Sequence, residues 1–90
     1  MQLARVIGTV VATVKNDSLE GRKLLIVQTL NWRLEPSGKP MVAVDAVGAG
    51  YHERVLVVAG SSARLAQGMK DVPVDAAIVG VIDTVDVVQD

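Results

Sequence analysis

The stretch "DAVGAGYHERVLVVAGSSAR", residues 45–64, holds several residue types that could do chemistry. Two glycine-marked turns flank an aliphatic run, and the chain's one histidine, His52, lies between them. A Gly-x-Gly turn beside a strand can bind phosphate, and a histidine near an acid and a serine can activate a nucleophile. Each of these chemistries requires a particular spacing, which can be checked in the sequence.

Both phosphate-binding patterns fail on spacing. A dinucleotide fingerprint built on Gly48 and Gly50 needs a third glycine where Glu53 stands, and the residues that follow have the pattern of a strand rather than a helix. A P-loop around "SGK" needs glycine and Ser or Thr at the positions of Arg33 and Pro40. The glycines are explained by the backbone freedom that a tight turn between strands requires.

The sequence has no spacing typical of a catalytic triad. His52 could be paired with Asp45, and Ser61 or Ser62 could be the nucleophile, but no motif connects these residues. The simpler interpretation of His52 is an exposed loop residue. We therefore expect that the protein is not an enzyme.

Metal ligands are also missing from the sequence pattern. The chain has no cysteine, which excludes disulfides and thiolate metal sites, and a single histidine excludes sites built on several imidazoles. Asp83, Asp86 and Asp90 do not follow the spacing of a calcium loop and are interpreted as solvated charges. We expect no cofactor and no metal.

The residues above must be positioned by short strands, which the aliphatic segments predict. Valine, a β-branched residue that favours strands, accounts for 18 of the 90 residues. In the first segment the even-numbered positions are small and apolar, so this face should point into a narrow interior, and Gly8 in mid-strand indicates a bend or bulge. The expected strands are residues 3–14, 23–30, 41–47 and 54–59, with a final strand or pair of strands over 76–88.

The connections complete the predicted fold. Residues 31–40, with two prolines, are expected to project as a long hairpin tip, and Gly80 marks a second bend. Residues 61–67 have a serine N-cap and are followed by Gly68, which predicts one short helix. The sequence therefore predicts an all-β fold, a small closed five-stranded β-barrel of OB-like size with one short helix, in a single domain over residues 1–90.

Composition favours an oligomer. Half of the residues are hydrophobic, the mean hydropathy is +0.38 and the formal net charge is −1. A small domain cannot bury all of this apolar surface by itself, and a near-zero charge removes the repulsion that keeps chains apart. With one Trp, one Tyr, no Phe and no basic excess, we expect no nucleic-acid partner. No apolar run approaches the roughly 18 residues of a membrane span, so we expect no membrane partner and a cytoplasmic location.

Three segments carry a resemblance to a known family. "MQLARVIGTVVATVKNDSLEGRKLLIVQ", "AVDAVGAGYHERVLVVAGSSAR" and "PVDAAIVGVIDTVDV", in this order, resemble the pentameric vertex proteins of bacterial microcompartments, which include carboxysome and ethanolamine-utilisation vertex subunits. The resemblance implies a five-stranded barrel and a homopentamer in the shell, whose partners are hexameric shell proteins. Flat hexamers cannot close a shell without five-fold points, so a structural vertex protein is the function implied. The family usually has glycine at the position of His52.

The resemblance also implies where subunits meet. The two glycine-marked turns become candidates for a subunit interface or for close approach near the five-fold axis, and so do the neighbours of these glycines. These candidates are Gly48, Ala49, Gly50, Tyr51, His52, Ser61, Ser62 and Arg64. Leu3, Ile7 and Val11, on the odd-numbered face of the first strand, are candidates for covering by a neighbouring subunit. The alternative function is an OB-like binding module for single-stranded nucleic acid or a small ligand.

Overall fold

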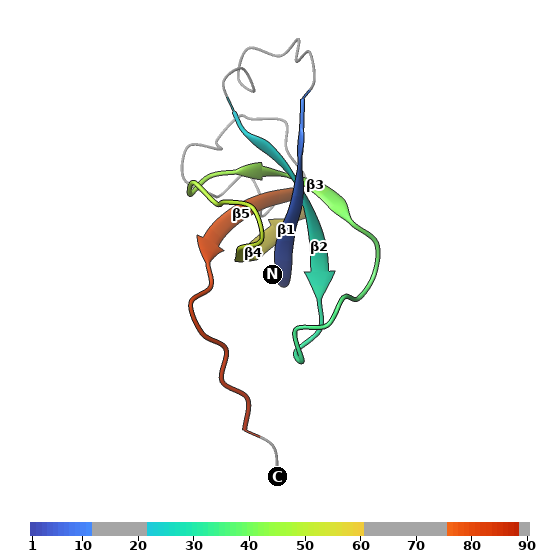
Figure 1. Cartoon of the computed structure of the whole chain (residues 1–90), viewed down its shortest axis with the longest axis vertical. Coiled ribbons are helices and arrows are strands. Elements are labelled where there is room, and N and C mark those ends of the chain that lie inside the picture. Colours follow the sequence, from blue (N-terminus) through green and yellow to red (C-terminus); the bar gives the residue numbers. More distant parts are fainter. Residues whose placement is uncertain (12–21, 61–75, 89–90) are drawn as a thin grey trace.

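Five strands form a closed barrel in the computed structural model, which describes residues 1–11, 22–60 and 76–88 (Figure 1). Around the barrel the strand order is β1-β2-β3-β5-β4, and every neighbouring pair is antiparallel except β3 with β5. The strands are β1 (Gln2–Val10), β2 (Leu24–Leu30), β3 (Met41–Asp45), β4 (Arg54–Ala59) and β5 (Ala76–Val81). The predicted all-β, five-stranded barrel is confirmed, whereas the predicted helix over 61–67 lies outside the described residues.

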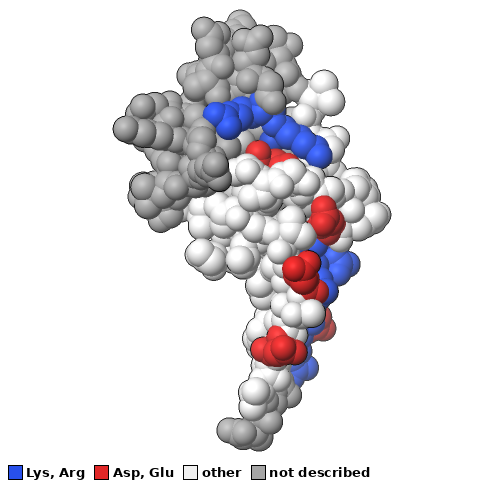
Figure 2. Space-filling view, turned by 90° about the vertical axis from the view of Figure 1, so that its left-hand side faces the viewer, with Lys and Arg blue, Asp and Glu red and all other residues white. Residues whose placement is uncertain are grey.

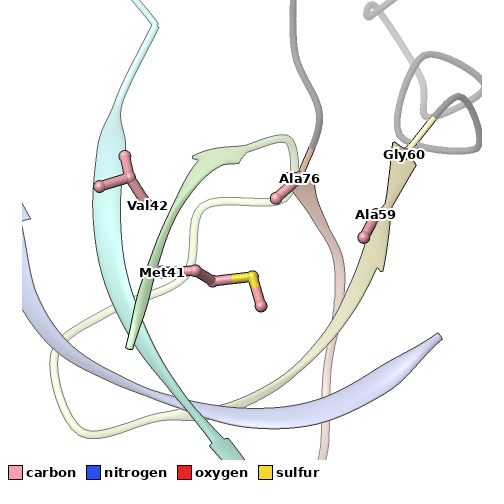
Figure 3. A pocket seen from close by; sticks show the side chains of 5 residues that line it. All are labelled: Met41, Val42, Ala59, Gly60 and Ala76. Carbon is pink, nitrogen blue, oxygen red and sulfur yellow. The ribbon is translucent and has the colours of Figure 1, made fainter. Parts of the chain in front are cut away.

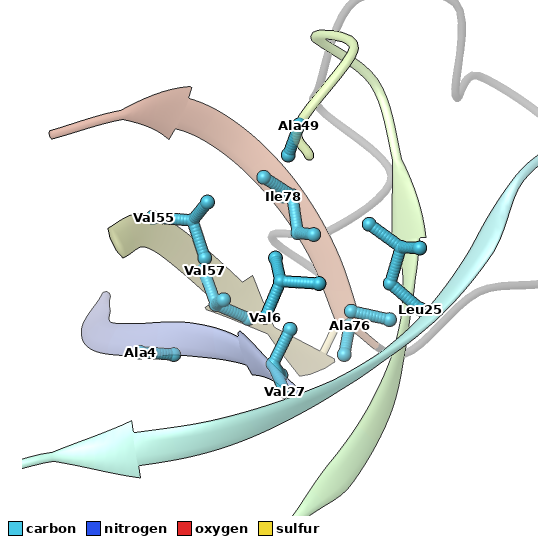
Figure 4. Close-up of a cluster of buried hydrophobic side chains, with 10 residues drawn as sticks. Ala4, Val6, Leu25, Val27, Ala49, Val55, Val57, Ala76 and Ile78 are labelled. Atoms are coloured by element: carbon cyan, nitrogen blue, oxygen red, sulfur yellow. The ribbon is translucent and has the colours of Figure 1, made fainter. Parts of the chain in front are cut away.

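Small side chains fill the barrel (Figure 4). In β1, Ala4 and Val6 are fully buried while Arg5 and Ile7 face outward, as the alternation predicted. A barrel of five strands has a narrow interior, which suits Ala and Val better than aromatic residues. The buried cluster consists of Ala4, Val6, Leu25, Val27, Ala43, Ala49, Val55, Val57, Ala76 and Ile78.

The two strand glycines lie where the ladders are irregular, as predicted. The register between β1 and β2 shifts between Val6 and Gly8, so Ile7 is the extra residue of a bulge. Between β4 and β5 the partner of Leu56 is Gly80 while that of Val57 is Ile78, which makes a second irregularity. Such bulges bend strands strongly enough to close a small barrel.

Three strands end earlier than the sequence predicted. The prediction extended the first strand to Val14, but β1 ends at Val10 and Val11 has no strand assignment. The prediction extended the third strand to Val47, but β3 ends at Asp45, whose side chain accepts hydrogen bonds from the next residues. The prediction extended the last strand or strand pair to Val88, but β5 ends at Val81. Its neighbour β4 begins only at Arg54, so the ladder has no further partner there. Within the described ranges, no helix is long and apolar enough to cross a membrane.

The loop between β2 and β3 is internally bonded. Asn31 Oδ1 accepts hydrogen bonds from the backbone N–H groups of Arg33 and Glu35, at 2.9 and 3.1 Å. The Arg33 guanidinium stacks 4.8 Å from the ring centre of the exposed Trp32. This connection joins two antiparallel strands, so the predicted hairpin tip over 31–40 is confirmed.

After β5 the chain leaves the barrel (Figure 1). Residues 82–88, which we call the C-terminal arm, have no helix or strand assignment and run away from the barrel. The arm begins at Ile82, whose N–H donates to the Arg54 carbonyl oxygen at 2.8 Å. The chain measures 49 × 23 × 21 Å along its principal axes.

Candidate functional site

The candidate turn residues that the structure describes lie in the loop between β3 and β4, residues 46–53. Asp45 starts this loop, because its Oδ1 accepts hydrogen bonds from the N–H groups of Val47 and Gly48, both at 3.0 Å. Such an Asx turn favours a following residue with positive φ, and Gly48 has φ +81°. The sequence "DAVG" therefore forms a turn that is held by the Asp45 side chain, as the glycine predicted.

The next residue anchors the loop to the barrel. Ala49 is 0% exposed and belongs to the same buried cluster as Ile78 (Figure 4). Its carbonyl oxygen accepts a hydrogen bond from Lys23 Nζ at 3.0 Å. The Ala49 side chain is therefore part of the subunit core.

Two backbone hydrogen bonds fasten the end of the loop to β1. The His52 N–H donates to the Val6 carbonyl oxygen at 3.0 Å, and the Val6 N–H donates to the Glu53 carbonyl oxygen at 2.9 Å. Within the loop, the Glu53 N–H donates to the Gly50 carbonyl oxygen at 3.2 Å, and the Gly50 N–H donates to the Glu53 carboxylate. The loop is thus fixed at both ends.

The two loop positions differ in why they favour glycine. Gly50 does not have positive φ, but a Cβ there would lie 2.9 Å from Glu53 Oε1. His52 has φ 69°, in the left-handed region where glycine is favoured. Histidine is among the residues that tolerate this region, which explains how a non-glycine residue can occupy position 52.

Tyr51 and His52 form the exposed tip of the loop. Their rings meet edge to face with centres 4.2 Å apart and an interplanar angle of 86°, and Tyr51 is 60% exposed. Val47 is also exposed. A rigid loop that presents apolar and aromatic groups to solvent is suited to contact another chain.

The candidate set is therefore only partly brought together. Gly48, Gly50, Tyr51 and His52 share one accessible loop, and Ala49 points into the barrel instead. Ser61, Ser62 and Arg64 lie outside the described residues. The sequence analysis did not predict a role for Lys23 or Val47, because no local motif marks them. It also did not predict the contact of Glu53 with Gly50, although the spacing Gly-x-x-Glu across a turn could have indicated it.

The described part of the chain contains no arrangement suited to catalysis. Asp45 Oδ1 is occupied by two backbone N–H groups, and no hydrogen bond joins Asp45 to His52 within the described residues. In the same ranges no group of three or more His, Cys, Asp or Glu could hold a metal ion.

A hollow near one end of the barrel is lined by apolar residues, and the Met41 side chain projects into this hollow (Figure 3). Its described lining residues are Met41, Val42, Ala59, Gly60 and Ala76.

Among the described residues on the face that Figure 2 shows, side chains of both charges are present beside a broad uncharged surface. Several large apolar side chains are exposed in the described ranges, including Ile7, Trp32, Val42, Val47 and Tyr51. This surface is suited to contact with protein.

Comparisons with known proteins agree with this interpretation. A family model described as "Ethanolamine utilisation protein EutN/carboxysome" matches residues 1–83. The bacterial microcompartment shell vertex protein GrpN of Rhodospirillum rubrum is 53% identical over 88 residues, covering 98% of this chain and 99% of the relative. The carboxysome shell vertex protein CcmL of Synechocystis is 54% identical over 87 residues, covering 97% of this chain and 87% of the relative.

A solved structure gives the same result. The barrel is similar, with a TM-score of 0.88, to the GrpN pentameric microcompartment shell protein from Rhodospirillum rubrum, and the match covers 98% of this chain and 100% of that chain at 53% identity. Family model, identity, coverage and fold therefore agree over nearly the whole length. The chain belongs to the EutN/carboxysome family of microcompartment shell vertex proteins.

Proposed function

We propose that the 90-residue chain acts as one domain that assembles into a homopentamer, and that this ring caps vertices of a bacterial microcompartment shell in the cytoplasm. The observation that carries the proposal is the full-length likeness to a shell protein that is itself pentameric. The role is structural, because the ring supplies five-fold points between hexameric shell proteins.

The physical features of the subunit support this role. Exposed apolar groups on a rigid loop, such as Val47 and Tyr51, favour association through protein contacts. We propose that the accessible candidates Gly48, Gly50, Tyr51 and His52 lie at a subunit contact, together with Ser61, Ser62 and Arg64.

Native mass spectrometry and sedimentation velocity test the ring. We expect one discrete species with five times the subunit mass. A stable monomer at micromolar concentration would contradict the proposal.

Shell closure is tested by co-expression with hexameric shell proteins, followed by electron microscopy. We expect closed polyhedral shells with the protein and elongated or open assemblies without it. Identical assemblies in both cases would contradict a vertex role.

The prediction that the protein has no nucleic-acid partner is tested separately. In fluorescence anisotropy with single-stranded oligonucleotides we expect no binding that depends on salt concentration. Salt-sensitive binding would favour the OB-like binding module instead.

A further inference from the structure

The outer face of the β1–β4 pair is mainly apolar and carries two neighbouring arginines. We call it the β1–β4 outer face and define it by Leu3, Arg5, Ile7, Arg54 and Leu56. Leu3 pairs with Leu56, and Arg5 pairs with Arg54, in antiparallel register. Side chains of directly opposed residues lie close together on one face of a sheet. Two like charges are thus held side by side in an apolar surround.

The two arginines have no acidic partner in the part of the chain that the structure describes. Neither the Arg5 nor the Arg54 guanidinium makes an ion pair or a hydrogen bond there. Opposed like charges destabilise a strand pair. Carboxylates from a partner would relieve this repulsion and form charge-assisted hydrogen bonds with the two arginines, which favours binding of such a partner on this face. Arginine beside apolar groups is also typical of the buried centre of protein interfaces.

The C-terminal arm has the complementary chemistry. Its charged residues in the described range are Asp83 and Asp86, and it has no basic residue. Its valines include Val87, which is 49% exposed, and Val88, which is 91% exposed. Beyond the bond from Ile82, residues 83–88 make no hydrogen bond to other described residues. The exposed valines of the arm are thus available to pack on a surface outside their own barrel.

We propose that the arm of one subunit packs on the β1–β4 outer face of an adjacent copy. This inference rests on the ring put forward under Proposed function. Valines of the arm would contact Leu3, Ile7 and Leu56, and its aspartates would face Arg5 and Arg54. Each subunit then gives one arm and receives another, and such head-to-tail contacts close into a ring.

The reach of the arm is sufficient. The residues of the arm span up to about 23 Å when extended at about 3.3 Å each. The short dimensions of the molecule are 23 and 21 Å. An arm that leaves its own barrel, as Figure 1 shows, can therefore extend across most of a neighbouring subunit.

Disulfide crosslinking tests the contact directly, because the chain has no natural cysteine. In the full-length protein, Val87→Cys in the arm is combined with Ile7→Cys on the β1–β4 outer face. The matched control combines Val87→Cys with Ser37→Cys, which lies on the exposed loop between β2 and β3. After mild oxidation, we expect the first pair to give a ladder of covalent oligomers up to five subunits on a non-reducing gel, and the control pair to give none.

The single-cysteine variants show how much crosslinking comes from random collision, and native mass under reducing conditions shows that each variant still assembles. A ladder with the control pair and none with the first pair would overturn the proposal. So would the absence of a ladder with both pairs, or a crosslink confined to single chains.

A double-mutant cycle tests the charges. One variant carries Asp83→Asn with Asp86→Asn, and the other carries Arg5→Gln with Arg54→Gln. We expect each to raise the protein concentration at which half of the ring dissociates by about fivefold or more, and the combination to do little further harm. Glu35→Gln removes a carboxylate from an exposed loop side chain and is expected to leave this concentration unchanged. Additive effects of the two variants would overturn the proposed contact.

The wild type distinguishes the two levels of inference. If it forms a pentamer while the arm variants neither crosslink nor weaken the ring, only the arm contact is wrong. A monomeric wild type would overturn the ring and the arm contact together.

Discussion

The backbone at position 52 decides which side chains the loop tip tolerates. His52 has φ 69°, and a β-branched residue meets a larger steric penalty there than His, Asn or Gly. We expect His52→Val to lower the free energy of unfolding by about 1–2 kcal/mol, and His52→Asn and His52→Gly to change it by less than about 1 kcal/mol. Urea unfolding at one protein concentration measures this. Equal stability of the Val and Asn variants would contradict the backbone explanation.

Gly50 and Glu53 form a coupled pair at the same scale. A Cβ at position 50 would displace the Glu53 carboxylate, which accepts a hydrogen bond from the Gly50 N–H. We expect Gly50→Ala to cost about 0.5–1.5 kcal/mol in the wild type, because the exposed Glu53 side chain can move aside but loses its hydrogen bond, and clearly less in a Glu53→Ala background. The free energies of unfolding of the two single variants and the double variant measure the coupling. If the costs simply add, the two residues act independently.

At the residue scale the sequence predicts the turn but not every role in it. Gly48 was interpretable from local pattern, because an Asx turn and positive φ involve residues near one another in sequence. The burial of Ala49 depends on how the loop folds over Ile78, and its bond to Lys23 joins residues that are 26 positions apart. Contacts of that range follow from the fold and have no local signal.

Asp45 ends strand β3 and starts the loop between β3 and β4. We expect Asp45→Ala to lower the free energy of unfolding by about 1–3 kcal/mol, because it leaves the N–H groups of Val47 and Gly48 without their acceptor. Hydrogen exchange should become faster at these two amides while that of Val27 in the barrel changes little. Glu35→Ala, at an exposed carboxylate, is the control and should change neither quantity. Unchanged exchange at Val47 would mean that the loop is held by its other bonds.

Element existence was predictable, while element ends depended on partners. Period-two alternation correctly identified the inward face of β1, since Ala4 and Val6 are buried. The apolar run continues past Val81 in sequence, yet β5 stops there because β4 begins at Arg54. A strand continues only while at least one neighbour pairs with it, and its neighbours are known only once the order of strands is known.

At the scale of the whole molecule, the loop between β3 and β4 is the subunit contact that we propose. We expect Gly50→Val to keep the β-sheet circular dichroism of the barrel but to weaken the ring, because a bulky group at a repeated contact acts in every subunit. With hexameric shell proteins it should yield elongated or open shells in electron microscopy. Glu35→Ala serves as the control. Wild-type ring mass and closed shells for Gly50→Val would show that this loop has no role in assembly.

At this scale, composition and alternation were sufficient for the type of fold. They predicted a small barrel with surplus apolar surface, and exposed groups such as Ile7 and Tyr51 agree with that. They did not predict that β3 and β5 pair in parallel, because residues such as Val44 and Ala77 are far apart in sequence and no local pattern connects them. They also did not predict that the C-terminal arm leaves the barrel, because the alternating Val85 and Val87 favour a strand.

Closure of the barrel has a consequence for behaviour at high concentration. Exposed strand edges are the usual templates on which chains stack into insoluble cross-β fibres, and a closed barrel has none. Two such molecules can therefore adhere only through side chains or through segments outside the barrel, so backbone pairing cannot spread from one molecule to the next. A β-rich, valine-rich chain is thereby protected from amyloid-like stacking for as long as its barrel remains folded.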